Sequence, residues 1–203
     1  MHARSPLTLA STLALALAVT FPGTLAAQNA REPLAVEPAS AAPASAATAR
    51  GAAPLAGRYR FVSGRDSVRR AVDAVCDRLD FFTRAFARPI LEDRNQPYDA
   101  VSLAIEDDVV SFTLGEWGPV RTREGATRTI RNERGESVRV HQVVRDGRLV
   151  QTLATDQGSR RNVIQASPDG RVLTIDTVIT SPRLPIPLRY RLVYHREAGA
   201  QSR

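Results

Sequence analysis

Few residues in this sequence stand in a pattern that would perform acid–base, nucleophilic or metal chemistry. His2 lies at the extreme N-terminus, and the two remaining histidines, His141 and His195, match no metal-ligand spacing. Both alternate with Arg or Val in a strand-like pattern, which favours solvent-facing side chains. The sequence contains no Gly-x-Ser-x-Gly elbow, phosphate-binding loop or dinucleotide fingerprint. It therefore predicts no catalytic residue, no metal site and no cofactor, and favours a protein that is not an enzyme.

The carboxylates and the single thiol have structural interpretations. Glu106, Asp107 and Asp108 could hold a cation or act as an acid–base pair, but Asp also favours tight turns, and we expect a hairpin turn here. Asp176 lies in mid-strand, where we expect it to be exposed; the alternative is a buried carboxylate with an Arg partner. Cys76 is the only cysteine, and its apolar neighbours at helical spacing predict a buried, inert thiol.

Aromatic side chains are the best candidates for a binding site. Tyr190 and Tyr194 share a strand face with Leu188 and Leu192, so we expect both tyrosines to point inward. Their buried hydroxyls would then need partners from the protein or from a ligand. Trp117, the single tryptophan, stands in a glycine-rich loop. It could form a ligand platform at a barrel mouth or half-buried cover for one end.

A β-meander must position these candidates. Short runs of alternating apolar residues recur between residues 100 and 196, separated by turn residues at 106–108, 133–135, 145–147, 156–158 and 168–170. The Asp146–Gly147 pair is a strong hairpin signal. The proline-rich segment 181–187 is predicted to be a loop, bulge or edge, and the last strand runs from Leu188 to Arg196. The count of about nine to ten strands predicts a mainly β fold, a single antiparallel meander barrel or strongly curved sheet.

One N-terminal amphipathic helix is predicted after the first strand. Apolar residues recur at three-four spacing from Val68 to Phe86, and Arg and Asp occupy the other face. The mixed charge of that polar face favours packing on the sheet over lying on a membrane. We expect a helix from Asp66 to Phe86 to cover or plug one end of the barrel. Phe82 and Phe86 would lie on its packed face, and Pro89 would end or kink it.

The segments that precede and follow the barrel have a different composition. Residues 1–27 combine a basic start, an apolar run from Leu7 to Val19 and small residues at Ala26 and Ala27, which is typical of a secretory signal peptide. The run is shorter than the roughly 20 residues of a membrane-spanning helix, so we expect no transmembrane span in the mature form. The predicted location is exported, either periplasmic or secreted. Residues 28–56 predict a disordered Pro/Ala-rich linker, 57–197 the barrel domain and 198–203 a disordered tail.

The charge pattern excludes several partners and chemistries. The net charge is +7 and every basic residue is Arg, so lysine Schiff-base and general-base chemistry is excluded. Acidic residues interleave with Arg, and the chain has neither a basic block nor an aromatic stacking platform, so nucleic acid is not an expected partner. The densest basic stretch, 121–139, predicts a solvated strand face; contact with an anionic polymer is the alternative.

This layout resembles the calycin group, meaning lipocalins and especially fatty-acid-binding-protein-like barrels. The likeness rests on the opening Gly57-Arg58-Tyr59, the early helix, the run of hairpins and the closing strand with Tyr190, Arg191 and Tyr194. Tyr59 stands where lipocalins have a Trp. The resemblance implies that an Arg and a Tyr near the C-terminus hold a ligand carboxylate, and Arg191 and Tyr190 are the nearest matches. Because they are adjacent in one strand, only one can point inward. The segment from Thr180 to Leu192 also resembles exported bacterial proteins.

Two functions from different classes follow. The leading hypothesis is an exported binding protein that holds a small apolar or amphipathic, lipid-like ligand inside a β-barrel, with tyrosine hydroxyls orienting its polar end. The alternative is an envelope structural or interaction protein whose Arg-rich strand faces contact acidic partners. An enzyme of another type is disfavoured by the missing nucleophile–base constellation.

Overall fold

The computed structural model describes residues 55–114, 119–131 and 135–197. The predictions for the signal peptide, nearly all of the linker, the C-terminal tail and Trp117 concern residues outside these ranges. No helix within the ranges is long and apolar enough to cross a membrane.

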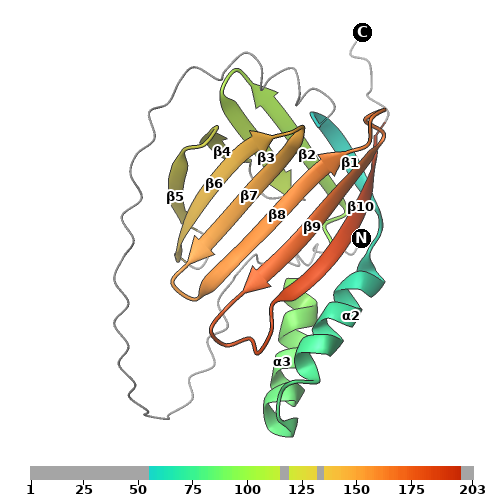
Figure 1. Ribbon diagram of the computed structural model, residues 1–203, viewed down its shortest axis with the longest axis vertical. Coiled ribbons are helices and arrows are strands. Elements are labelled where there is room, and N and C mark those ends of the chain that lie inside the picture. Colours follow the sequence, from blue (N-terminus) through green and yellow to red (C-terminus); the bar gives the residue numbers. More distant parts are fainter. Residues whose placement is uncertain (1–54, 115–118, 132–134, 198–203) are drawn as a thin grey trace, which may run out of the picture.

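Ten antiparallel strands form one meander that curls into a nearly closed barrel (Figure 1). The strands are β1 (Gly57–Ser63), β2 (Ala100–Glu106), β3 (Val109–Leu114), β4 (Val120–Arg123), β5 (Thr127–Arg131), β6 (Ser137–Arg145), β7 (Arg148–Thr155), β8 (Gly158–Ala166), β9 (Val172–Thr180) and β10 (Leu188–Arg196). The sheet order is β4-β3-β2-β1-β10-β9-β8-β7-β6-β5, so the first and last strands pair in the middle of the sheet. This arrangement confirms the predicted mainly β fold, a single antiparallel meander barrel.

The two ends of the sheet, β4 and β5, approach each other through the residues that join them. The backbone N–H of Gly125 donates to the carbonyl of Gln142 in β6 (2.8 Å), and the N–H of Val144 donates to the side chain of Glu124 (3.2 Å). These contacts place β4 beside β6 and bring the sheet round on itself. The predicted turn at Asp107–Asp108 joins β2 to β3, and Asp146–Gly147 joins β6 to β7, with Asp107, Asp146 and Gly147 all at positive φ.

Two helices, and not the single predicted helix, follow β1: α2 (Arg65–Cys76) and α3 (Phe81–Arg94). They lie together at one end of the barrel, and α2 packs beside β10 (Figure 1). The helix is interrupted between them because Asp80 caps the start of a second helix. Its carboxylate accepts hydrogen bonds from the backbone N–H groups of Phe82 (3.1 Å) and Thr83 (3.0 Å). Pro89 was expected to end or kink the helix; it does not end it, because α3 continues past it to Arg94.

The break also corrects the predicted packed face. Phe82 and Phe86 are 76% and 67% exposed, because α3 starts afresh at Phe81 and no longer continues the face of α2. The residues that α3 buries are Ala87 and Leu91, which lie on either side of Pro89.

The apolar core lines the inside of the barrel and extends under the helices. Along β6 to β10, buried residues alternate with exposed or half-buried ones, which defines an interior and an outer face. Val68, Val72, Val75 and Cys76 of α2 belong to the same apolar cluster as the interior strand residues. Leu55 is also fully buried there, and its carbonyl accepts a hydrogen bond from the Tyr59 hydroxyl (3.0 Å).

Candidate functional site

A row of polar side chains runs across the interior face of the barrel. Five consecutive strands each place one polar residue at the same level, because Gln142 pairs with Gln151, Gln151 with Asn162, Asn162 with Thr177, and Thr177 with Tyr190. Thr122 of β4 extends the row, since its hydroxyl donates to Oε1 of Gln142 (2.9 Å). We call these six residues the polar belt. All are 5% exposed or less, so the belt is removed from solvent.

Apolar rows flank the belt on both sides. The row on one side is entirely aliphatic, and the row on the other side is aliphatic except at Arg160. By strand register the first row is Val144, Leu149, Ile164, Ile175 and Leu192, and the second is Val140, Leu153, Arg160, Ile179 and Leu188. Among the described residues, the interior therefore combines a polar band with an apolar lining and one buried cation.

Arg160 is the charged group of this interior. Its side chain is 7% exposed. Its Nη2 donates to the Tyr190 hydroxyl (2.9 Å) and its Nε donates to Oδ1 of Asn162 (3.3 Å). Among the residues that the structure describes, no carboxylate oxygen lies within 4.0 Å of its guanidinium. A buried cation held only by neutral partners is incompletely compensated for the water it has lost.

The belt connects Arg160 to helix α3. The Tyr190 hydroxyl accepts from Arg160 and donates to Oδ1 of Asn95 (3.2 Å). Asn95 is the residue at the C-terminal end of α3, and its Nδ2 donates to the carbonyl of Leu91 (2.8 Å). The helix at the barrel end and the interior cation are therefore linked by two consecutive side-chain hydrogen bonds.

Two further tyrosines lie within the electrostatic influence of Arg160. Burial raises the pKa of Tyr194 and of Tyr98, and the nearby positive charge of Arg160 offsets part of the rise in both pKa values. Both groups are therefore neutral phenols at physiological pH. Within the described part of the chain, the buried hydroxyl of Tyr194 has no hydrogen-bond partner.

The structure separates the residues that the sequence proposed as ligand contacts. Tyr190 and Tyr194 lie on the interior face, as predicted. Arg191 points outward and makes a two-point ion pair with Asp176 of β9 (Nε–Oδ1 2.6 Å, Nη2–Oδ2 2.9 Å). Of the adjacent pair Tyr190 and Arg191, of which only one could point inward, it is therefore Tyr190 that faces the interior, because strand alternation turns Arg191 to the outer face. The same ion pair confirms that Asp176 faces outward.

The remaining sequence candidates lie away from the interior. His141 and His195 occupy outer-face positions of β6 and β10. Cys76 is buried in the core as predicted, and burial raises the pKa of its thiol. Among the described residues, no group of three or more histidine, cysteine or acidic side chains could hold a metal ion.

Sequence reasoning missed Arg160 and most of the belt, although a signal was present. Gln142 lies between Val140 and Val144 at two-residue spacing. Gln151 stands between Leu149 and Leu153 in the same way. A polar residue flanked at i−2 and i+2 by aliphatic residues shares their face. Applied to each strand, this rule would have placed both glutamines in the interior.

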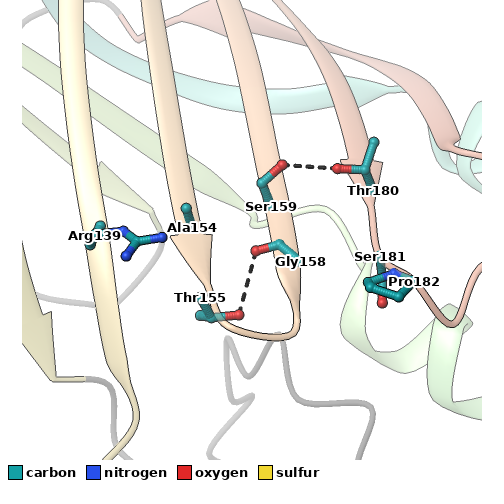
Figure 2. Close-up of a pocket in the computed structure, with 8 residues that line it drawn as sticks. All are labelled: Arg139, Ala154, Thr155, Gly158, Ser159, Thr180, Ser181 and Pro182. Atoms are coloured by element: carbon teal, nitrogen blue, oxygen red, sulfur yellow. Dashed lines mark hydrogen bonds between the residues drawn. The ribbon is translucent and has the colours of Figure 1, made fainter. Parts of the chain in front are cut away.

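An outer pocket of about 400 Å³ lies at the ends of β6 to β9 (Figure 2). Its strand residues Arg139, Ala154, Ser159 and Thr180 form one row on the outer face. Figure 2 shows that the hydroxyls of Ser159 and Thr180 bond to each other (2.9 Å). These two hydroxyls therefore satisfy each other's hydrogen-bonding capacity.

No model of a known protein family and no curated protein sequence matches this chain. Among solved structures, it is similar to a Schistosoma mansoni fatty acid binding protein in complex with arachidonic acid, with a TM-score of 0.46 and 14% identity, covering 73% of this chain and 99% of that chain. It is also similar to an abundant heat soluble protein from Ramazzottius varieornatus, with a TM-score of 0.48 and 10% identity, covering 71% of this chain and 96% of that chain. A luciferase domain from Lingulodinium polyedrum gives a TM-score of 0.46 and 15% identity, and the match covers 70% of this chain and 42% of that chain. The function of this chain therefore has to be inferred from its own residues.

Proposed function

We propose that the protein binds a small amphipathic molecule inside the barrel and holds its anionic head group at Arg160. The buried guanidinium, which lacks a carboxylate partner among the described residues, is the observation that supports this function. Removing such a cation from water costs several kcal/mol, and the neutral oxygens of Asn162 and Tyr190 recover only part of it. A ligand carboxylate would complete the site, because a guanidinium presents a planar fork of donors that matches two acceptor oxygens.

The apolar rows on either side of the belt suit the body of such a ligand. Contact between hydrocarbon and the aliphatic interior removes apolar surface from water, which favours binding by about 25 cal/mol per Å² buried. The positive charge of Arg160 also acts on the buried, neutral phenols of Tyr98 and Tyr194, whose pKa values it lowers in part against the effect of burial.

A fluorescent fatty acid tests this proposal directly. The full chain is titrated with cis-parinaric acid and, separately, with its uncharged methyl ester. We expect the acid to bind more tightly than the ester. Arg160→Met should weaken binding of the acid about tenfold to hundredfold, which is the range for a hydrogen-bonded ion pair, and should leave the ester affinity nearly unchanged.

Arg161→Met is the matched control. Arg161 is the next residue of β8, it lies on the outer face, and its substitution removes the same charge. It should leave both affinities unchanged. If acid and ester bind equally to the original protein, or if Arg161→Met weakens the acid as much as Arg160→Met does, the head-group assignment is wrong. If neither probe binds, binding of an amphipathic ligand in the interior is wrong as well.

The setting that we propose is outside the cytoplasm, as a periplasmic or secreted protein. The support is the signal-like pattern of residues 1–27. N-terminal sequencing of the mature protein from its own host should give a new N-terminus close to Ala26 or Ala27. A mature chain that still begins at Met1 would contradict export by this signal.

A further inference from the structure

Two buried side-chain NH2 groups of the polar belt have no hydrogen-bond partner among the described residues. Gln142 and Gln151 pair directly across β6 and β7, and they are 0% and 1% exposed. Among the described residues, Nε2 of each side chain has no hydrogen-bond partner. A buried amide donor without an acceptor is unfavourable, and native proteins contain few of them.

The hydrogen bonds of the belt fix which atom of Gln151 is left over. Arg160 can only donate, so the atom of Asn162 that meets it must be the oxygen Oδ1. The same Oδ1 accepts from the Thr177 hydroxyl (2.9 Å). Nδ2 of Asn162 must therefore be the donor toward Gln151 (2.9 Å), which commits Gln151 Oε1 as the acceptor. Nε2 of Gln151 is the atom that remains.

Gln142 is oriented from the other side of the belt. Its Oε1 accepts from the Thr122 hydroxyl (2.9 Å), which leaves its Nε2 unpaired beside Gln151. The two amide donors thus come from neighbouring strands at the same level. By the spacing of the sheet, the Cα atom of Gln151 lies about 8 Å from that of Arg160, one strand across and two residues along, and the Cα atom of Gln142 lies about 12 Å away, two strands across.

We propose that Gln142 and Gln151 form a second polar subsite, which binds an uncharged acceptor oxygen on the body of the ligand. This inference rests on the proposed function, because it assumes that the head group lies at Arg160. Neutral amide donors suit a hydroxyl or carbonyl oxygen, and Arg160, the one buried cation in the described part of the chain, takes the anionic end. The ligand class is therefore an oxygenated amphiphile, with an anion at one end and a hydroxyl or keto group along its chain.

Oleate and ricinoleate are matched probes, because ricinoleate carries the same chain with one additional mid-chain hydroxyl. Binding of both to the full chain is measured by displacement of cis-parinaric acid. We expect the original protein to prefer ricinoleate about fivefold to thirtyfold, the effect of one or two net hydrogen bonds. In the double variant Gln142→Leu, Gln151→Leu this preference should disappear, and the oleate affinity should be retained or increased.

Two controls separate this inference from the proposed function. Gln165→Leu removes a glutamine from the outer face of β8 and should keep the preference. Arg160→Met should weaken both probes alike and also keep it. If oleate and ricinoleate bind equally to the original protein, the second subsite is wrong while the head-group site stands. If neither binds, both proposals are wrong.

A spectroscopic measurement does not depend on the variants folding. The side-chain amide NMR signals of Gln142 and Gln151 should shift on addition of ricinoleate and much less on addition of oleate. Equal shifts with both probes would contradict a specific contact with the hydroxyl.

Discussion

Replacing Tyr190 by Phe should expose how strongly the interior cation depends on one hydroxyl. That hydroxyl accepts from Nη2 of Arg160 (2.9 Å) and donates to Oδ1 of Asn95 (3.2 Å). A hydrogen bond to a charged group contributes about 1.5–3 kcal/mol and one between neutral groups about 1 kcal/mol. We therefore expect Tyr190→Phe to lower the free energy of unfolding by about 3 kcal/mol. For a domain of this size, the melting temperature should fall by roughly 10 °C.

A double-mutant cycle isolates the part that belongs to the cation. In an Arg160→Met background, Tyr190→Phe loses only the bond to Asn95 and should cost about 1 kcal/mol. The coupling energy between Tyr190 and Arg160 should then be about 2 kcal/mol. The measurement is equilibrium urea unfolding of ligand-free protein, followed by far-ultraviolet circular dichroism, for the original protein, both single variants and the double variant.

The control cycle uses Arg161→Met, which removes a charge from the outer face of the same strand. There the two substitutions should add to within about 0.5 kcal/mol. If the Arg160 and Tyr190 substitutions also add to within about 0.5 kcal/mol, Tyr190 does not stabilise the incompletely compensated charge of Arg160 and the reasoning is wrong. Hydrogen exchange gives an independent check, because loss of the Asn95 bond should speed exchange in α3 more than in β6 or β7.

Four further substitutions test local features of the fold. Tyr194→Phe should raise the free energy of unfolding by about 1 kcal/mol near neutral pH, because it removes a buried hydroxyl without a partner among the described residues. Burial raises the pKa of Tyr194, so as the pH rises the unfolded chain loses the phenol proton before the folded protein does. Above about pH 10 the original protein should therefore lose stability more steeply than Tyr194→Phe, which is measured by urea unfolding at a series of pH values. Hydrogen bonds from Thr83 lower the pKa of Asp80. The stability that the original protein has over Asp80→Ala should therefore reach its full value above about pH 4 and decrease as the pH falls below that. A stability difference that does not change with pH would contradict the cap. Gly64→Ala should lower the free energy of unfolding in urea by about 3 kcal/mol or more, because Gly64 has a φ of +125° and a Cβ there would lie 2.5 Å from the Arg191 carbonyl oxygen. Gly125→Ala is the comparison: its φ is also positive but its Cβ would meet open space, so it should lower the free energy of unfolding by only about 1–2 kcal/mol.

The barrel was predictable because its signals are local. The Asp146–Gly147 pair fixes a hairpin through its own backbone conformation, and alternation in the last strand gives both its bounds and the inward face of Tyr190. The helix break was not predictable from periodicity alone. The apolar spacing continues through Asp80 to Phe86, and only the capping bonds of Asp80 decide that a new helix starts there.

The site was harder to predict because it depends on which strands become neighbours. Arg160 and Asn162 alternate with Arg161 and Val163, so the segment shows no clear apolar face of its own. Their inward direction follows from pairing with β7 and β9, which bring Leu153 and Ile179 beside Arg160. The resemblance to fatty-acid-binding barrels predicted a tyrosine with an arginine near the C-terminus. The structure keeps that Tyr190 but supplies the arginine from β8, thirty residues earlier.

The polar belt is difficult to explain by packing alone. Five of its six positions, from Gln142 to Tyr190, lie between rows that are aliphatic except at Arg160, so aliphatic side chains there would extend an existing core. Such a replacement would remove two unpaired amide donors, and substituting buried polar groups by well-packed apolar ones is often neutral or stabilising. A barrel selected for stability alone would thus have little reason to keep Gln142, Gln151 and Arg160 at adjoining interior positions. Their shared orientation is explained if the lost stability is recovered when a ligand with matching oxygens is bound, since a ligand that binds only the folded state stabilises it.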